Sequence, residues 1–516
     1  MKETFWYTLR GMYTVKVRGD YINGKFLRPR GPERRIVSKD PGDSGYRIGS
    51  FPVYPQHVDK AVAAARRAFG RWSRLDQTQR ADMLRKFAAE VVNNRGELIE
   101  LIAAETGKPA WEAEAEARDV EARVETEIRE GVRSVSPFKV GEIRWGVEGS
   151  CRFKPLGIAA VLGPAISPVH LACSQIIPAL LAGCTVVFKP SKLAPATGQF
   201  VASLLDEVEL PKGVFNLVQG DAATGSQLAS HADVDAVLFT GSYPAGKHIL
   251  QATAEQPHKM VALQMGGVNV ALVLEDADFE QALYETVTGA FLTSGQRYTT
   301  TGVILVEKAL YSRFAEAFVE VVKSLKVGYS LDPGVFMGPV LSDSARVRFL
   351  DLQQRMSATD ARQLLEGRPL KLERPGFYLS PAVHATDKAA DIDEFRPEGL
   401  SFGPDVVLIP VENGEKGCDL ANTTQFPFAA AVFSQDPQRF EECAGRLRFG
   451  IVNCNTATTS TSMRLPLGGA RKCSNHRPAG VFSQRNCTFP VASLRAHTPF
   501  EPDRVLPGYP RKPTDW

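Results

Sequence analysis

Cysteine, histidine and hydroxyl side chains are the residues of this chain that could serve as nucleophiles, bases or metal ligands. The eight cysteines are scattered without a CxxC pair, and the eight histidines do not cluster with them at the spacing of a zinc site. We therefore expect reduced thiols and no metal. The run from Tyr298 to Thr301 offers four hydroxyls, but no histidine that could act as a base lies nearby in the sequence.

Composition and charge indicate a large cytoplasmic protein with an ordinary core. The 516 residues give room for two or three domains at ~100–200 residues each. Hydrophobic residues make up 44% and charged residues 23%, which excludes a disordered or fibrous chain. The net charge of +3 gives no electrostatic reason to expect binding to nucleic acid or to an anionic membrane. Neither a signal peptide nor an apolar run of ~18 residues is found, so no spanning helix is expected.

Hydrophobic periodicity predicts helices first and a parallel sheet later. Apolar residues recur at helical spacing from His57 onward, and residues 110–133 carry Glu and Arg in a pattern typical of a solvated helix face. Short apolar runs then alternate with helix-length stretches, which predicts a parallel sheet covered on both faces, and a second α/β region is expected over 270–475. The runs predicted as strands are Ile158–Leu162, Thr185–Phe188, Phe215–Val218, Ala236–Phe239 and Met260–Leu263.

Six short segments, in this order and spacing, resemble the aldehyde dehydrogenase superfamily. They are FKPS at 188–191, FTGS at 239–242 with Gly246, MGG at 265–267, SGQR at 294–297, FGP at 402–404 and PLGG at 466–469. The resemblance runs from about Asp20 to Leu494. Two further segments, NHRP at 475–478 and PVASL at 490–494, are similar to the succinylglutamate-semialdehyde dehydrogenase family, whose members oxidise a semialdehyde with NAD in arginine breakdown.

The resemblance implies the three-part α/β aldehyde dehydrogenase fold. A Rossmann-like cofactor domain, a second α/β domain of the catalytic type and an oligomerisation β-flap are expected, with a tail at each end. The implied boundaries are 1–19 for the first tail, 20–136 and 155–262 for the cofactor domain, 263–475 for the catalytic-type domain, 137–154 and 481–499 for the flap, and 500–516 for the second tail.

The resemblance also locates four positions that carry catalytic roles in the family, and here each holds a residue that cannot perform that role. Tyr298 stands where the family has its cysteine nucleophile, and Gln264 where it has the general base. Ile166 replaces the oxyanion-hole Asn, and Leu400 replaces the carboxylate that orients the nicotinamide ribose. Loss of an oxyanion donor lowers a rate by about 10²–10³ and loss of a base by about 10²–10⁴, so we expect no covalent dehydrogenase activity.

The implied cofactor site is partly retained. Lys189 stands where the family contacts the adenosine ribose, and the turn that covers the pyrophosphate keeps Gly241, Ser242 and Gly246. Lys192, however, replaces the glutamate that binds the ribose hydroxyls. Two cations suit a phosphorylated ribose better than NAD, so we expect no dinucleotide or weak NADP, with NAD unable to bind productively.

Substrate recognition is predicted to be reduced as well. The family's arginine pair just past the nucleophile is replaced by Gly302 and Val303, whereas Arg297, His476 and Arg477 remain. The last two residues are also compatible with a structural cap of their loop.

These replacements lead to the prediction of a pseudoenzyme, a protein of this fold kept for binding or assembly rather than for dehydrogenase chemistry. We expect a homodimer or a larger homo-oligomer, with a protein partner or an active paralogue as possible associates. Two alternatives are an NAD(P)-linked oxidoreductase with a non-covalent mechanism, in which Tyr298 acts as an acid, and a nucleotide or metabolite sensor.

Overall fold

The computed structural model describes most of the 516-residue chain. The described ranges are 6–9, 12–27, 31, 34–144, 146–396, 403–498 and 507–508. Leu400 and most of the predicted C-terminal tail lie outside them. Within these ranges no helix is long and apolar enough to cross a membrane.

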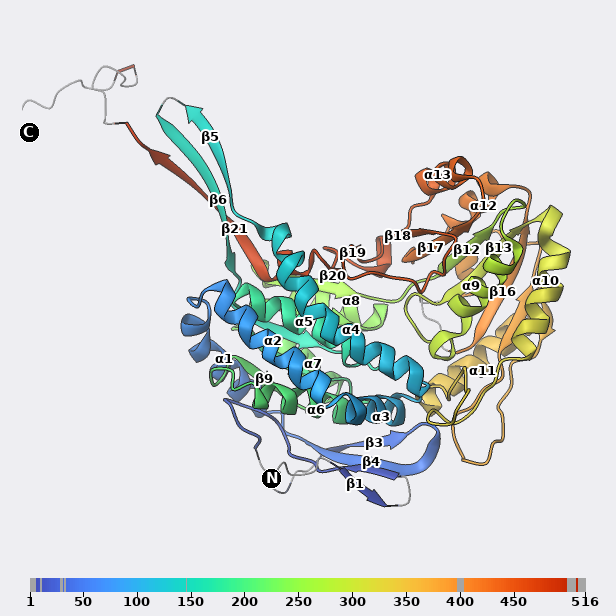
Figure 1. Cartoon of the computed structure of the whole chain (residues 1–516), viewed down its shortest axis with the longest axis horizontal. Helices are drawn as coiled ribbons and strands as arrows, with labels where there is room; N and C mark the ends of the chain where they lie inside the picture. Colours follow the sequence, from blue (N-terminus) through green and yellow to red (C-terminus); the bar gives the residue numbers. More distant parts are fainter. Residues whose placement is uncertain are drawn as a thin grey trace, which may run out of the picture.

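A five-stranded parallel sheet, in the order β11-β10-β7-β8-β9, forms the centre of the first α/β unit. This unit is the blue to green part of the ribbon in Figure 1. All five strands predicted from the sequence are present, and the α/β fold class is confirmed. Their β-branched and aromatic residues are almost all buried, as expected for a parallel sheet covered by helices. The strands are β7 (Ile158–Leu162), β8 (Thr185–Lys189), β9 (Phe215–Leu217), β10 (Ala236–Thr240) and β11 (Met260–Gln264).

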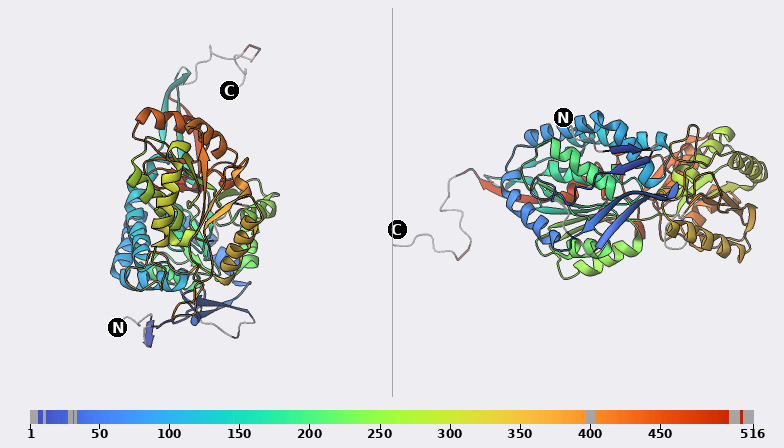
Figure 2. Two further views of the ribbon diagram at one scale, coloured as in Figure 1. Left: turned by 90° about the vertical axis from the view of Figure 1, so that its right-hand side faces the viewer. Right: turned by 90° about the horizontal axis from the view of Figure 1, so that it is seen from below.

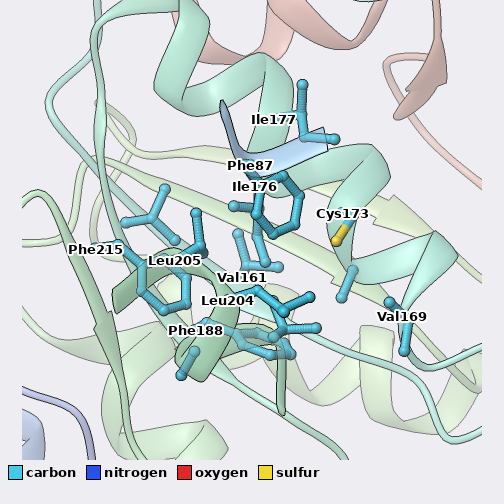
Figure 3. Packing of buried hydrophobic residues seen from close by; sticks show 14 of the residues in the cluster. Phe87, Val161, Val169, Cys173, Ile176, Ile177, Phe188, Leu204, Leu205 and Phe215 are labelled. Carbon is cyan, nitrogen blue, oxygen red and sulfur yellow. The ribbon is translucent and has the colours of Figure 1, made fainter. Parts of the chain in front are cut away.

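Helices cover both faces of this sheet. Because neighbouring strand residues point to opposite faces, Val161 and Phe188 pack against α5 and α6 (Figure 3), whereas Leu162 and Val187 pack on the side of α1, α7 and α8. Helices α2, α3 and α4 form a further layer over α5 and α6. The helices are α1 (His57–Trp72), α2 (Gln77–Asn93), α3 (Arg95–Thr106), α4 (Ala110–Arg129), α5 (His170–Ala182), α6 (Pro195–Glu207), α7 (Ala222–Ser230) and α8 (Tyr243–Thr253).

The charge-rich helix α4 differs from its sequence-based prediction. A solvated face was expected, yet Glu112, Glu116, Arg123 and Glu127 are buried. Arg123 and Glu127 form an ion pair of 2.5 Å with both side chains fully buried. Arg123 also donates to the carbonyl oxygen of Gly480 at 3.1 Å. The buried charges therefore attach α4 to the C-terminal segment instead of facing water.

A seven-stranded sheet forms the second α/β unit, in the order β14-β15-β16-β13-β12-β17-β18. All neighbouring strands are parallel except β14 and β15, which pair antiparallel. Helices α9 and α10 pack on one face, and α12 and α13 on the other. The elements are β12 (Asn269–Val273), α9 (Phe279–Phe291), β13 (Thr301–Glu307), α10 (Lys308–Lys323), α11 (Asp343–Ser357), β14 (Arg362–Leu365), β15 (Ala382–Ala385), β16 (Asp405–Val411), α12 (Gly414–Ala421), β17 (Ala429–Phe433), α13 (Pro437–Arg446) and β18 (Ile451–Cys454).

A three-stranded antiparallel sheet, β21-β6-β5, extends beyond the helical body in both views of Figure 2. It lies in the segments for which a β-flap was predicted; the domain boundaries themselves stay a prediction. Smaller antiparallel pairs complete the fold. These strands are β5 (Phe138–Arg144), β6 (Val147–Pro155), β21 (Thr488–Ala496), β1 (Trp6–Leu9), β2 (Met12–Val15), β3 (Arg34–Asp40), β4 (Asp43–Val53), β19 (Pro466–Leu467) and β20 (Ala479–Gly480).

The buried ion pair of α4 gives a stability prediction. Arg123→Met should lower the free energy of unfolding by about 3–5 kcal/mol, because Glu127 is left as a buried carboxylate without its charge partner. Denaturant titration measures the loss. The double variant Arg123→Met/Glu127→Leu should recover most of it, since an apolar replacement of a buried ion pair is often neutral. A double variant no more stable than the single one would contradict this account.

Candidate active site

The segment that precedes Tyr298 has a strained backbone. Thr293, Ser294 and Gly295, in the short turn η2 (Leu292–Gly295), all have left-handed φ angles of 53°, 53° and 67°. For residues other than glycine this conformation costs about 1–3 kcal/mol each, and such strain is concentrated at functional sites. Two consecutive non-glycine residues in this region therefore need strong support from their surroundings.

Glu112 of α4 provides that support. Its carboxylate is 1% exposed. It accepts hydrogen bonds from the Thr293 N–H at 2.9 Å and from the Thr293 hydroxyl at 2.5 Å. It also pairs with the Arg297 guanidinium at 2.8 Å, and Arg297 Nε donates to Thr293 Oγ1 at the same distance. One buried carboxylate thus satisfies both hydrogen-bond donors of Thr293. It also holds Arg297, the residue next to Tyr298, in place.

The braced turn presents Tyr298 to a cavity that opens to solvent. Its ring packs edge-to-face on Phe428, with centroids 4.9 Å apart, and its backbone oxygen accepts from Asn269 Nδ2 at 3.0 Å. Burial raises the pKa of Tyr298 to about 12, although the facing Gln264 side chain and Arg297 lower it in part. The phenol is therefore protonated at neutral pH and can donate a hydrogen bond or a proton.

Gln264, at the end of β11, faces the Tyr298 hydroxyl and is only 1% exposed. Neither its Oε1 nor its Nε2 atom has a hydrogen-bond partner among the described residues. Leaving a buried amide unpaired costs about 1–3 kcal/mol. Gln264 is not among the residues that line the cavity in front of Tyr298, so its amide faces the Tyr298 hydroxyl and not the cavity itself.

The cavity in front of Tyr298 has a volume of about 110 Å³. Of the residues predicted from the sequence, it brings together Ile166, Arg297 and Tyr298. His476 and Arg477 are not among its lining residues. Both have positive φ angles, of 54° and 51°, and Arg477 donates to a backbone oxygen of its own loop. These features are those of a structural cap of the loop. Leu400 lies outside the described residues.

The sequence analysis missed the charged wall of this cavity, formed by Lys108, Glu112, Glu116 and Asp119 together with His170. The three acidic residues on α4 are spaced i, i+4 and i+7, which places them on one helix face. This shared helix face is the sequence feature by which these three acidic residues could have been distinguished from the solvent-facing charged residues of α4.

Lys108 and Glu116 form a buried ion pair of 2.5 Å on this wall. Burial opposes ionisation of Glu116, but Lys108 and two backbone N–H groups at the start of α5 outweigh it and hold the pKa of Glu116 below its ordinary value. Burial lowers the pKa of His170, so its ring is neutral, and its Nδ1 has no hydrogen-bond partner among the described residues.

The predicted cofactor residues lie at the ends of β8 and β10. The ammonium of Lys189 donates to the carbonyl oxygens of Pro190 at 2.6 Å and Gly220 at 3.2 Å, and burial lowers the pKa of Lys189 to about 8. Its third N–H remains for a ligand hydroxyl. Ser242 caps the N-terminus of α8, whose first turn has no acidic residue. This donor set fits the ribose and phosphate groups of a dinucleotide.

The two glycines of this turn have packing roles. A Cβ atom at Gly246 would lie 2.4 Å from the sulfur of Met265, and one at Gly241 would lie 2.4 Å from the ring of Phe239. Gly246 therefore allows α8 to pack closely on its sheet. Lys192, three residues after Lys189, is exposed.

The family model of the aldehyde dehydrogenase family matches residues 29–488. The chain belongs to this family. It is 36% identical over 495 residues to the N-succinylglutamate 5-semialdehyde dehydrogenase of Paraburkholderia xenovorans, an alignment that covers 95% of this chain and 99% of that protein. The protein of the same name from Chromobacterium violaceum is 34% identical with the same coverage. The predicted resemblance is thus confirmed.

Solved structures agree with this assignment. Betaine aldehyde dehydrogenase of Staphylococcus aureus in complex with NAD⁺ superposes with a TM-score of 0.87 at 26% identity and covers 95% of this chain and 96% of that chain. HpcC of Thermus thermophilus gives a TM-score of 0.88 at 27% identity, with 94% coverage of both chains.

Two sequence-based predictions are wrong in the light of these relatives. The pseudoenzyme prediction is overturned because proteins similar over 95% of the chain are named as dehydrogenases, which points to an enzyme. The prediction of no dinucleotide, or of weak NADP alone, is overturned by a relative solved with NAD⁺. The error arose because the side chains at four aligned positions were taken to decide the function, whereas the similarity to these relatives extends over 95% of the chain.

The role of Glu112 can be tested on stability. Glu112→Gln should lower the free energy of unfolding by about 1–3 kcal/mol, because the strained Thr293 and the Arg297 guanidinium lose a charged acceptor. Thermal and urea denaturation measure this change in the free energy of unfolding. Glu114→Gln is the matched control, since Glu114 lies on the same helix in a solvent-exposed pair with Arg118 and should change stability by less than about 0.5 kcal/mol. Equal effects of the two variants would contradict the bracing role.

Proposed function

We propose that this chain is an NAD(P)-linked oxidoreductase that acts on an aldehyde carbonyl without a covalent intermediate. The observation that carries this proposal is the protonated phenol of Tyr298, which lines the cavity and faces the buried side chain of Gln264. Full-length similarity to proteins named as dehydrogenases supports an enzymatic role.

We expect the dinucleotide to be held by Lys189 and Ser242. Lys189 offers its remaining N–H to a ribose hydroxyl, and the N-terminus of α8 favours phosphate. A nicotinamide dinucleotide bound there would supply the hydride that an aldehyde carbon needs to become an alcohol carbon.

Tyr298 supplies the proton that this reduction also needs. As the carbonyl carbon receives a hydride, the developing alkoxide oxygen takes the phenolic proton, so that the aldehyde becomes an alcohol and Tyr298 a phenolate. Arg297, the preceding residue in the chain, stabilises the phenolate, because its positive charge already lowers the pKa of Tyr298. The Gln264 side chain, which also lowers the pKa of Tyr298, favours the same phenolate. In the reverse direction the phenolate would accept the proton of an alcohol.

A covalent thiol route does not fit the described site. Cys473, whose backbone oxygen accepts from the N–H of Met265 next to Gln264, and Cys173, one turn along α5 from the cavity, are both fully buried. Burial raises the pKa of both thiols, so neither supplies a thiolate at neutral pH.

The proton donor can be tested directly. Tyr298→Phe should lower kcat for NAD(P)H-dependent aldehyde reduction by about 10²–10⁴-fold, because the ring is kept and the proton donor is lost. NAD(P)H oxidation is followed by absorbance, and cofactor binding by fluorescence should be unchanged. Tyr284→Phe is the control, since Tyr284 is 69% exposed and should retain full activity. Undiminished turnover in the Tyr298 variant would refute the assignment.

We also propose that the chain assembles into a homodimer or larger homo-oligomer through the β21-β6-β5 sheet. Phe138 and Ile143 on β5 and Leu494 on β21 are at least 50% exposed, and both outer strands are unpaired on one edge among the described residues. Exposed apolar edge strands promote pairing with another chain. A symmetric contact between two copies would bury them.

Light scattering after size exclusion tests this assembly. The unmodified chain should have at least twice the mass of one 56.3 kDa chain. Leu494→Lys combined with Ile143→Lys should shift the mass toward one chain, because two charges would have to be buried. Tyr284→Lys, an exposed substitution on α9, should leave the mass unchanged. A single-chain mass for the unmodified protein at tens of micromolar would contradict the proposal.

A further inference from the structure

Two cysteines meet between helices α12 and α13, on one face of the second sheet. Cys418 lies on α12 and is fully buried, whereas Cys443 lies on α13 and is 5% exposed. The Cys418 sulfur is 3.8 Å from the backbone oxygen of Cys443, and its thiol is also within hydrogen-bonding reach of the Cys443 sulfur. Both are free thiols, 25 residues apart in the sequence. The packing of the two helices therefore brings together two thiols that are distant in the chain.

Cys443 also lines a pocket of about 220 Å³. The lining residues Glu415, Glu442 and Arg446 are exposed, so this pocket opens to solvent. Cys418 is not among the lining residues. Hydrogen peroxide is little larger than a water molecule, and a space of this volume admits it. An oxidant of this size in the pocket therefore reaches the sulfur of Cys443 before that of Cys418.

The surroundings of Cys443 favour its thiolate. A Cβ atom on Gly414, the first residue of α12, would lie 3.2 Å from the Cys443 sulfur, so this sulfur packs against the N-terminus of that helix. The positive end of a helix dipole stabilises an anion. The hydrogen bond from Cys418 holds the pKa of Cys443 below its ordinary value, and the charge of Arg439 acts in the same direction, against burial and two nearby glutamates. Thiolate character combined with access from a pocket is the environment of a reactive cysteine.

Two other cysteine sites provide a comparison within the chain. Cys184 and Cys487 also lie together, with the Cys184 sulfur 3.1 Å from the Cys487 backbone oxygen, but both are fully buried and burial raises the pKa of both. Cys454 is exposed, yet partial burial and the charge of Glu441 raise its pKa. Neither site has the lowered pKa of Cys443, so both serve as internal controls.

We propose that Cys443 is a peroxide-reactive thiol and that Cys418 joins it in a disulfide between α12 and α13. The Cys443 thiolate attacks one oxygen of hydrogen peroxide, the O–O bond breaks, and hydroxide leaves and takes up the proton that the thiol released. This two-electron step oxidises Cys443 to a sulfenic acid and reduces the peroxide to water. The Cys418 sulfur then attacks the Cys443 sulfur, the S–O bond breaks, and the hydroxyl group leaves with the Cys418 proton as a second water.

The disulfide would restrain a segment that reaches the candidate active site. The chain between the two cysteines contains β17 and, directly before it, Phe428, whose ring packs against Tyr298. A cross-link that closes this segment limits its conformational freedom. The thiol pair itself is separate from the cavity in front of Tyr298, so the proposal does not depend on the proposed function.

Peptide mapping of the full-length chain tests the site directly. The protein is reduced, freed of reductant and exposed to hydrogen peroxide, and its remaining thiols are alkylated in denaturant before digestion and mass spectrometry. We expect the peptides of Cys418 and Cys443 to be joined, with the loss of two hydrogens, and to separate again in dithiothreitol. Cys184 and Cys487 should remain thiols. Cys443 left as a thiol, Cys443 over-oxidised without a bond to Cys418, or prior linkage of Cys184 to Cys487 would overturn the proposal.

Two variants test the order of the steps. In Cys418→Ala the sulfenic acid of Cys443 should accumulate and be trapped by dimedone at least about fivefold more than in the unmodified chain, because the thiol that consumes it is absent. In Cys443→Ala the thiol of Cys418 should stay reduced. Cys454→Ala is the matched control and should leave the disulfide yield unchanged. Oxidation of Cys418 in the absence of Cys443, or no added trapping in Cys418→Ala, would refute the assigned roles. The peptide map of the unmodified chain needs no substitution and stays decisive if a variant fails to fold.

Discussion

The hydrogen bonds between Glu112 and Thr293 are the interaction on which the site depends. Left-handed Thr293 and Ser294 would relax toward ordinary backbone angles if their surroundings allowed it. Glu112 prevents this by occupying both the N–H and the hydroxyl of Thr293, and Arg297 completes the network. Since α4 is itself attached to the C-terminal segment through Arg123, the turn before Tyr298 is held by contacts that span much of the chain.

The position of Tyr298 explains how a residue of ordinarily high pKa can contribute to chemistry. Its ring packs against Phe428, and burial raises the pKa of Tyr298, which keeps the phenol protonated. The neighbouring guanidinium of Arg297 favours the phenolate. It therefore offsets part of the rise in the pKa of Tyr298 that burial causes. The cavity wall beside it carries two paired cations, Lys108 with Glu116 and Arg297 with Glu112.

The sequence predicted the fold well and the site only in part. The strands of the first sheet were recognisable because their β-branched runs are bounded by Gly, Pro and Asn, and these local signals do not depend on tertiary contacts. Helix α4 was misjudged because a sequence rich in Glu and Arg does not show which residues face the interior. Glu112 is buried through its bonds to Thr293, 181 residues away, and no periodicity within the helix reports such a partner.

The conformation of the strained turn does not use the side chain at position 298. Among the described residues, the side-chain hydrogen bonds of Thr293, Ser294 and Gln296 join them to Glu112, Arg297, Gly338, Leu341 and the turn itself, and none of these bonds involves the Tyr298 hydroxyl. Substitution at 298 can therefore change the reacting group while the backbone that presents it stays the same. In evolutionary terms, a protein with this arrangement can exchange one chemistry for another by point mutation, without passing through an unfolded or disordered ancestor.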